Sequence, residues 1–506
     1  MHPMLFYVLL AFGCGVCLCD YWKDREELIK EEESQILGSS IKLTHEEEVV
    51  NKRLIKIKSE EFNNGFDNVV NFLPSQHFFK TKAQVENSKV FKFIQKLPKG
   101  ANLHVHDTAL VSGKFLFNLT YRNNLYACFR NGSFQLKFFS KPESSCKWIL
   151  LKKLRQISPS VDDFISSKFS LIVDNPERMY KSVDEVWTAF QDIFAVVSPL
   201  ITYRPVFEDY FYRALEELYE DNVMYLEFRG LLPEVYELNG TVYDEVEVAG
   251  LYINVLKKFK EDHPDFVGAK FIYAPMRLAD NATAWKYVET VKTLKEYYPD
   301  FLAGFDLVGE EKKGYPLKNF IEQIKSLEGI VKFFFHAGET KWYGTDIDEN
   351  LVDAILLNTS RIGHGFALLK HPKLLQMVKE KDIAIEVNPI SNQVLTYVKD
   401  LRNHPAIFYI NQNYPVVICN DDPSFWGTKG LSYDWYMAFM GLSSKYTDLR
   451  FLKQLAINSL KYSMFSNDDE RNFAFSLWEK KWKKFIMDFL QNQELQDYEN
   501  IKVVLV

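Results

Sequence analysis

Eight short apolar runs recur between about residue 100 and residue 420, and several of them carry His, Asp or Glu where the run ends. Longer stretches with helical periodicity separate the runs. Strands that alternate with helices predict a parallel sheet, and eight such units predict a closed barrel. We therefore expect an α/β fold, a (β/α)8 TIM-type barrel, with strands at 101–106, 223–228, 269–274, 302–307, 332–336, 361–364, 383–387 and 416–420.

The chain of 506 residues is longer than the roughly 250 that such a barrel needs. Over a hundred residues separate the first two strands, far more than one crossover helix requires. We expect an inserted subdomain at 114–175, which leaves the catalytic barrel to 96–113 and 176–495.

Residues 20–95 are rich in charge, and apolar residues recur among the charges at helical spacing. Amphipathic helices must bury their apolar stripes, either against the main body or against a second copy of the chain. We interpret this segment as an N-terminal helical dimerisation region, so the protein is expected to form a homodimer.

Residues 1–19 contain an apolar run that is too short to span a bilayer comfortably and is followed at once by polar residues. Small residues where signal peptidase would cut indicate a signal peptide, with an uncleaved anchor or a buried strand as alternatives. No later run approaches about 18 apolar residues, so no membrane span is expected. The predicted destination is extracellular, with the lysosome as the other candidate.

Export changes how several other residues are interpreted. Asn-X-Ser/Thr sequons, which are candidate glycosylation sites in a secreted chain, begin at Asn118, Asn131, Asn239, Asn281 and Asn358. Cys128 and Cys146 could pair in an oxidising compartment. Cys419 lies in an apolar run and is expected to be a buried thiol.

The formal charge of -7 and the absence of a block of Lys or Arg argue against a nucleic-acid partner. The chain also lacks a Walker A loop, a Gly-x-Gly-x-x-Gly fingerprint, a Gly-x-Ser-x-Gly elbow and a His-Glu-x-x-His helix. The classes of enzyme that depend on those motifs are thereby disfavoured.

Four candidate metal ligands stand at three strand ends. His104 and His106 alternate on one strand and so share a face, and His336 and Asp421 end later strands. Three His and one carboxylate can hold Zn2+ and leave a position open for water. A single histidine of this kind is more often structural, but the joint pattern favours a metal site.

Three further polar residues lie at the same rim. Glu339 follows His336 in a tight turn, where a carboxyl group can act as acid and base. His364 ends the next strand and could accept a proton or stabilise a hydroxide. Asp422 could recognise a polar edge of a substrate, although Asp-Asp-Pro alone is also typical of a helix N-cap. The pattern predicts a hydrolytic barrel of the amidohydrolase kind and leaves the substrate open.

A resemblance to a known enzyme family narrows the range of possible substrates. The sequences His-Val-His-Asp at 104–107, Asp-Leu-Val-Gly at 306–309, His-Ala-Gly-Glu at 336–339, Arg-Ile-Gly-His-Gly at 361–365 and Asn-Asp-Asp-Pro at 420–423 together resemble adenosine deaminases in order and spacing. Stretches at 219–223, 388–395, 401–405 and 429–434 resemble the secreted branch, the adenosine deaminase-related growth factors of adenosine deaminase 2 type.

The resemblance implies a role for each matching residue. One Zn2+ per subunit would be held by His104, His106, His336 and Asp421. Glu339 would protonate N1 of the purine, and His364 would orient and deprotonate the attacking water. Contacts to the substrate are implied for Asp422 near N7, the Gly309 N–H near N3, and Asp107 and Trp187 near the ribose.

The expected activity is secreted, zinc-dependent hydrolysis of adenosine and 2′-deoxyadenosine to the inosine nucleosides and ammonia, with growth-factor effects through adenosine depletion. One alternative is an extracellular growth factor that binds a cell-surface receptor or glycan through the insert. Another is a related amidohydrolase that acts on a different amine or on an adenine nucleotide.

Overall fold

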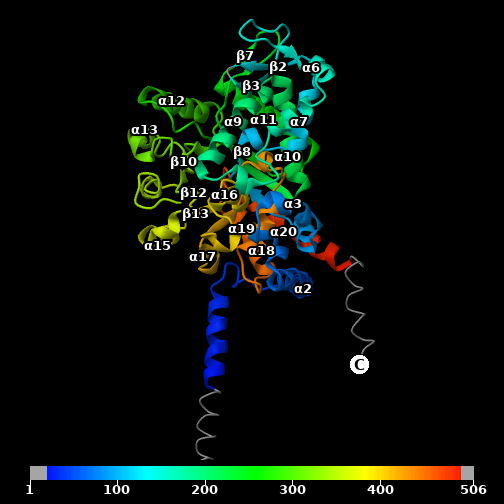
Figure 1. Ribbon diagram of the computed structural model, residues 1–506. Coiled ribbons are helices and arrows are strands. Elements are labelled where there is room, and N and C mark those ends of the chain that lie inside the picture. The colour runs from blue at the N-terminus through cyan, green and yellow to red at the C-terminus, as the bar shows by residue number, and fades with distance from the viewer. Residues whose placement is uncertain (1–19, 131, 492–506) are drawn as a thin grey trace, which may run out of the picture.

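The computed structural model describes residues 20–130 and 132–491, and its centre is a parallel β-barrel surrounded by helices (Figure 1). The barrel strands form two hydrogen-bonded sheets, in the orders β1-β5-β8-β9-β10 and β11-β12-β13-β14. Their bounds are Gly100–Asn102 (β1), Val223–Gly230 (β5), Gly268–Tyr273 (β8), Leu302–Phe305 (β9), Lys332–Phe333 (β10), His336–Ala337 (β11), Arg361–His364 (β12), Ala384–Val387 (β13) and Val416–Ile418 (β14).

Two features join these sheets into one barrel. β10 and β11 are parts of a single strand interrupted at Phe334 and Phe335. On the other side, Val105 pairs in parallel with Asp421, and the Asp421 N–H donates to the His104 carbonyl at 3.1 Å. The predicted (β/α)8 barrel is therefore confirmed for the described chain, with strand bounds within a few residues of those expected.

The barrel strands are buried along almost their whole length, because helices cover the outside of a parallel barrel. The Asp244 side chain begins one of these helices by accepting the Val246 and Glu247 N–H groups. The helices that follow the strands are α10 (Arg204–Glu220), α11 (Glu245–Asp262), α12 (Asn281–Tyr297), α13 (Ile321–Lys325), α14 (Asn350–Leu356), α15 (Pro372–Glu380), α16 (Pro389–Val394), α17 (Ala406–Asn411), α18 (Ser432–Gly441), α19 (Leu449–Lys461) and α20 (Asp468–Gln491).

The long interval after β1, where an inserted subdomain was predicted, holds a small antiparallel sheet of order β3-β2-β4. A disulfide joins Cys128 of β2 to Cys146. The elements here are α5 (Gly113–Asn118), β2 (Leu125–Arg130), β3 (Ser133–Phe138), β4 (Ile149–Leu150), α6 (Leu151–Ile157), α7 (Val161–Ser167), α8 (Pro176–Met179) and α9 (Val183–Ile201), and a hairpin of β6 (Val235–Tyr236) and β7 (Val242–Tyr243) follows β5.

The N-terminal arm is helical, as its periodicity predicts. Its elements are a helix at 20–34, α2 (His45–Asp67), the 3-10 turns η1 (Val69–Asn71) and η2 (Leu73–Ser75), α3 (Phe78–Asn87) and α4 (Lys89–Lys96). α2 packs on the barrel body: buried Lys58 donates to the carbonyls of Ser444 and Thr447.

The helix at 20–34 differs from the rest of the arm, because every one of its residues is exposed. Figure 1 shows this helix standing away from the body, with the insert at the opposite end of the molecule. Among the helices in the described part of the chain, none is long and apolar enough to cross a membrane. The predicted signal peptide at 1–19 lies outside the described residues.

Candidate active site

The predicted site residues converge at the C-terminal ends of the barrel strands, around a cavity of about 360 Å3. This is the end where barrels of this type hold their chemistry. The α9 helix adds an aromatic wall to the cavity. Its polar lining includes His106, Asp107, Thr108, Gln191, Ser198, His336, Glu339, His364, Asp421 and Asp422, and its apolar lining includes Trp187, Phe190, Phe194, Leu231, Met276, Leu278, Val308 and Leu395.

The four predicted metal ligands lie close together, and two of the imidazoles contact one carboxylate oxygen. Asp421 Oδ1 lies 3.2 Å from His104 Nε2 and 3.1 Å from His106 Nε2. The His336 ring centroid is 4.6 Å from that of His104 and 5.3 Å from that of His106. Possible ligand atoms of His104, His336, His364 and Asp421 lie within 4.8 Å of one another, and so do those of His106, Asp421 and Asp422.

Two of these atoms are buried without a hydrogen-bond partner, namely His104 Nε2 and Asp421 Oδ1. A buried polar atom without a partner is costly, and a bound cation would satisfy both atoms at once. Imidazole nitrogens with one carboxylate form a donor set that zinc accepts. The residues present therefore fit a metal ion.

The backbone at two site residues is strained. His364 and Asp421 have φ of 64° and 59°, in the left-handed region that residues other than glycine seldom adopt. Gly363, next to His364 in the chain, allows close packing, since a Cβ there would lie 3.1 Å from His104 Cε1 and 3.2 Å from His336 Cα. The strand ends are thus shaped to bring the imidazoles together.

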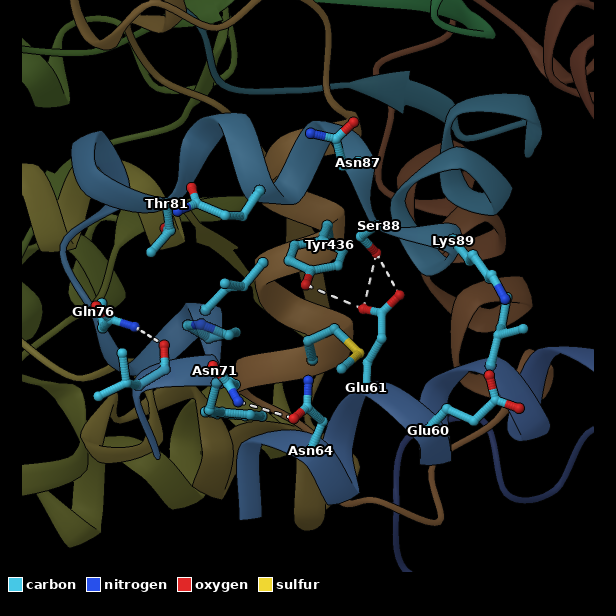
Figure 2. Close-up of a pocket in the computed structure, with 17 residues that line it drawn as sticks. Glu60, Glu61, Asn64, Asn71, Gln76, Thr81, Asn87, Ser88, Lys89 and Tyr436 are labelled. Carbon is cyan, nitrogen blue, oxygen red and sulfur yellow. Dashed lines mark hydrogen bonds between the residues drawn. The ribbon is translucent and has the colours of Figure 1, made fainter. Parts of the chain in front are cut away.

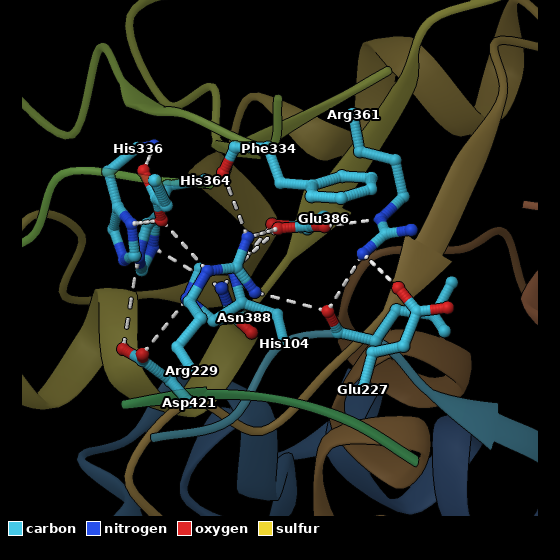
Figure 3. Close-up of polar contacts among 12 residues, drawn as sticks. His104, Glu227, Arg229, Phe334, His336, Arg361, His364, Glu386, Asn388 and Asp421 are labelled. Carbon is cyan, nitrogen blue, oxygen red and sulfur yellow. Dashed lines mark hydrogen bonds and ion pairs between the residues drawn. The ribbon is translucent and has the colours of Figure 1, made fainter. Parts of the chain in front are cut away.

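Buried carboxylates contact two of the predicted ligands, and Figure 3 labels one of these carboxylates, Glu386. His104 Nδ1 lies 2.7 Å from Glu386 Oε2, and His336 Nδ1 lies 2.5 Å from Asp306 Oδ2. Each contact leaves Nε2 free to face a metal ion, which is how such partners orient histidine ligands. Burial opposes ionisation of Asp306, but His336 and Arg229 hold its pKa well below the usual range.

Two buried arginines extend this network. Arg229 donates to Asp306 Oδ2 at 2.9 Å and to Glu386 Oε2 at 2.7 Å. Arg361 donates to Glu386 Oε1 at 2.6 Å and to Glu227 Oε2 at 2.7 Å. Because each arginine contacts two carboxylates, these charges can be fully buried.

Sequence reasoning assigned no role to these network residues. The sequence nevertheless contains an indication of this network. Glu227 and Arg229 alternate within a strand whose residues are all buried, so both side chains point to the same face of the sheet. A charged residue in the middle of a buried strand requires a partner, and here the partners lie 77 to 157 residues further along the chain.

The turn that carries Glu339 is fixed by another carboxylate. Glu311 accepts the Glu339 N–H at 2.6 Å and the Gly338 N–H at 3.2 Å, and Asn350 donates to it at 2.6 Å. Glu339 Oε1 is buried at the cavity without a hydrogen-bond partner, 3.5 Å from His364 Nδ1. Burial, together with the nearby charges of Asp421 and Glu311, raises the pKa of Glu339 well above its usual range.

The four predicted substrate contacts also line the cavity: Asp107, Trp187, Gly309 and Asp422. Burial raises the pKa of Asp107 to about 6, although hydrogen bonds from Thr108 and Tyr252 oppose the shift. Trp187 donates from Nε1 to the Tyr397 hydroxyl at 2.8 Å. Asp422 Oδ1 has no partner, and its burial beside Asp421 raises its pKa well above the usual range.

Several predictions concern residues outside the cavity. Cys419 is buried and free, as expected. Among the sequon asparagines, Asn118, Asn239, Asn281 and Asn358 are exposed, which a glycan requires, whereas Asn131 lies outside the described residues.

A second cavity, of about 640 Å3, lies between the arm and α18 (Figure 2). There Glu61 accepts a hydrogen bond from Ser88 at 2.8 Å, and the Tyr436 hydroxyl lies 3.4 Å away. None of the predicted metal, catalytic or substrate residues lines it. Although it is the larger cavity, it is separate from the strand ends.

A parallel barrel with imidazoles and carboxylates at its C-terminal rim defines a metal-dependent hydrolase of the amidohydrolase type. Comparisons with known proteins identify the family. A family model described as adenosine deaminase matches residues 171–479, and one described as adenosine/AMP deaminase N-terminal matches residues 18–94. The chain belongs to the adenosine deaminase family.

Named relatives cover nearly the whole chain. An adenosine deaminase of Aedes albopictus is 44% identical over 95% of this chain and 91% of its own length. Human adenosine deaminase 2 is 43% identical over 96% of this chain and 98% of its own length. The resemblance to the adenosine deaminase 2 type is thereby confirmed.

Solved structures support the fold. A zinc-bound amidohydrolase from Burkholderia ambifaria has a TM-score of 0.56 at 18% identity, over 80% of this chain and 95% of that one. The Arabidopsis N6-mAMP deaminase also has a TM-score of 0.56, at 18% identity, over 76% of this chain and 99% of that one.

Proposed function

We propose that this protein is a secreted, zinc-dependent adenosine deaminase that converts adenosine and 2′-deoxyadenosine to inosine and 2′-deoxyinosine with release of ammonia. The observation that carries the proposal is the contact of His104 and His106 with Asp421 Oδ1, with His336 beside His104 and Glu339 at the same cavity. The family membership adds independent support.

The proposed ligands are His104, His106, His336 and Asp421, with one zinc ion per subunit. When bound, zinc would lower the pKa of a coordinated water and so supply the nucleophile near neutral pH. The zinc-bound structural relative is consistent with this choice of metal.

Each remaining residue has a proposed role in the chemistry. Glu339, whose raised pKa keeps its carboxyl protonated, donates to N1 of the purine as water adds to C6. His364 orients the attacking water. Asp422 and the Gly309 N–H face N7 and N3 of the base, and Asp107 and Trp187 face the ribose.

The cavity favours a nucleoside over a nucleotide. Among the described residues that line it, none is a lysine or an arginine, and its mouth carries Met276 and Leu278, which are 38% and 62% exposed. A phosphate would enter without a cation to neutralise it. This argues against an adenine nucleotide as the substrate.

The direct test is the loss of adenosine absorbance with the purified, zinc-loaded protein. Turnover of adenosine and 2′-deoxyadenosine with little turnover of the 5′-monophosphate is the expected result. A zinc-replete protein that leaves adenosine unchanged, or full activity in Glu339→Ala, would show that the proposal is wrong.

Secretion is supported by the apolar segment at 1–19, by exposed sequon asparagines and by the Cys128–Cys146 disulfide. Expression in a secretory cell line should release a protein that begins near Asp20. Its mass should fall when N-glycans are removed enzymatically. Retention of the full chain inside the cell would contradict secretion, and accumulation in lysosomes would favour the alternative destination.

We also propose a homodimer formed through the N-terminal helices. The helix at 20–34 exposes Tyr21, Trp22 and Leu28, at 57%, 60% and 60%, and apolar side chains of this size usually find a partner surface. Sedimentation of the purified protein should give a dimer, and deletion of residues 20–34 should give a monomer. A monomeric full-length protein would contradict the proposal.

A second function is favoured by the charge of the insert. Residues 114–175 carry ten Lys and Arg against four Asp and Glu, in a chain whose net charge is -7. Such a basic unit suits an acidic receptor or an anionic cell-surface glycan. Cell-surface binding that persists in Glu339→Ala, with any growth effect intact, would separate this function from adenosine depletion.

A further inference from the structure

One turn of α16 carries three consecutive side chains, of which two contact active-site residues and the third contacts the N-terminal arm. Ser391 donates to Asp421 Oδ2 at 2.7 Å, and Asn392 Nδ2 lies 3.2 Å from His364 Nδ1. Gln393 points the other way, because its Nε2 donates to the Gln76 carbonyl of the arm at 2.9 Å. All three side chains are buried, so their partners are fixed.

The orientation of the Asn392 amide follows from His404. The Ala406 backbone N–H donates to His404 Nδ1 at 3.0 Å, so this nitrogen carries no proton. Burial lowers the pKa of His404 to about 3, and the neutral ring therefore carries its proton on Nε2. His404 Nε2 lies 2.9 Å from Asn392 Oδ1, which accepts that proton. The NH2 group of Asn392 must then face His364.

A second amide reaches the same atom of His364. Asn388 Nδ2 donates to the Glu386 carbonyl at 3.3 Å, which identifies that end of the amide as its NH2 group. The same nitrogen lies 3.4 Å from His364 Nδ1. Two amide donors thus face one ring nitrogen. The remaining neighbour of that nitrogen, Glu339 Oε1, lies 3.5 Å away and belongs to a carboxyl whose pKa is raised by burial, so it does not hold a proton on Nδ1. The two amides therefore make Nδ1 an acceptor.

We propose that Asn392, oriented by His404 and assisted by Asn388, is a positioning residue that fixes His364 as the tautomer with its proton on Nε2. The proposal rests on the proposed function for its catalytic consequence, although the tautomer itself can be observed without substrate. His364 Nε2 is the nitrogen that faces Asp421 Oδ2, at 3.9 Å.

The tautomer explains why a fourth imidazole close to the metal group need not be a ligand. His104 and His336 place Nδ1 against carboxylates, which accept its proton and leave an Nε2 lone pair for a metal. His364 places Nδ1 against amide donors, so its Nε2 carries a proton and has no lone pair to offer. The chemistry of the contacts favours His106 over His364 as the remaining histidine ligand.

The same tautomer narrows the catalytic role of His364. A ring with its proton on Nε2 can donate a hydrogen bond to the oxygen that attacks C6 and so hold it in line. It cannot take a proton at that nitrogen. Asn392 therefore determines that His364 orients the nucleophile rather than acting as its base.

The test is NMR of protein labelled with 15N-histidine, recorded for the metal-free and the zinc-loaded enzyme. The His364 signals are assigned by their loss in His364→Gln. The expected result in both forms is a proton on Nε2 and an unprotonated Nδ1. A proton on Nδ1 in the wild-type enzyme would overturn the proposal, whatever the variants do.

Asn392→Asp supplies the matched change, since the new carboxylate accepts a proton where the amide donated one. We expect His364 to switch to the tautomer with its proton on Nδ1 and kcat to fall about 10–100-fold, the range for a lost outer partner at a metal site. KM should change less than about threefold, because binding of the nucleoside is not affected. An unchanged tautomer with unchanged kcat would contradict the positioning role.

Gln393→Glu is the control for damage to α16. It alters the next, equally buried residue and puts a carboxylate against the carbonyls of Gln76 and Lys399. A lower Tm with the His364 tautomer unchanged is expected. His404→Gln, which can still donate to Asn392, should keep the tautomer better than His404→Leu. Equal NMR spectra for these two variants would exclude His404 from the mechanism.

Discussion

Glu386 Oε2 accepts the Nδ1 proton of His104 at 2.7 Å, and both side chains are fully buried. The same carboxylate receives Arg229 and Arg361, so burial does not neutralise it and its pKa stays well below the usual range. A charged carboxylate raises the basicity of the imidazole it holds. The metal affinity of the proposed site therefore depends on Glu386, which would not itself contact the metal.

Replacement of this carboxylate should weaken metal binding. Glu386→Gln is expected to lower zinc affinity about 10–100-fold, because His104 loses both its orientation and its anionic partner. Competition with a chromophoric chelator measures the affinity. Glu227→Gln is the control: it disturbs Arg361 in the same network but contacts no proposed ligand, so Tm should fall while zinc affinity stays near wild type. Equal zinc affinity in Glu386→Gln and the wild type would contradict the prediction.

Removal of the proposed acid should affect turnover and leave the metal in place. Glu339→Gln keeps the shape of the side chain but loses the titrating proton, and kcat should fall about 10²–10⁴-fold. Metal analysis should still find one zinc ion per chain. Activity near wild type would remove Glu339 from the chemistry, whereas loss of zinc would assign it a structural role instead.

The sequence predicted the barrel and the rim residues because those features are local: each strand is an apolar run, and each rim residue follows its strand directly. It did not predict the network behind them. Glu386 and Arg229 are 157 positions apart in the sequence, and their side chains come into contact only when the strands close into a barrel. The interruption of a strand at Phe334 and Phe335, and the path from His404 to His364, likewise depend on packing that short-range patterns do not encode.

The disulfide should stabilise the insert independently of the barrel. It closes a loop with a sequence separation of 18, and a loop of that length is worth about 3 kcal/mol by the chain-entropy account. Cys128→Ser with Cys146→Ser should make the insert sensitive to protease under native conditions. Deaminase activity should persist, since neither cysteine lines the catalytic cavity. Parallel loss of activity and of insert protection would show that the two units are coupled.

Acid should destabilise the protein through His404. Burial lowers its pKa from 6.5 to about 3. Between these two pH values His404 is protonated in the unfolded chain and neutral in the folded chain. Above pH 6.5 this pKa difference does not affect the free energy of unfolding. As the pH falls from 6.5 toward 3, it lowers the free energy of unfolding progressively. At pH 5 the loss is about 2 kcal/mol, since each pH unit is worth about 1.4 kcal/mol.

Denaturant unfolding at pH 7.5 and pH 5 measures this loss, and His404→Gln provides the comparison. The variant has no titrating ring, so its stability should fall by about 2 kcal/mol less than that of the wild type over the same interval. Identical pH dependence in both proteins would mean that His404 is protonated in the folded state. In that case its Nε2 and Nδ1 would both donate, and the contact with the Ala406 N–H could not persist.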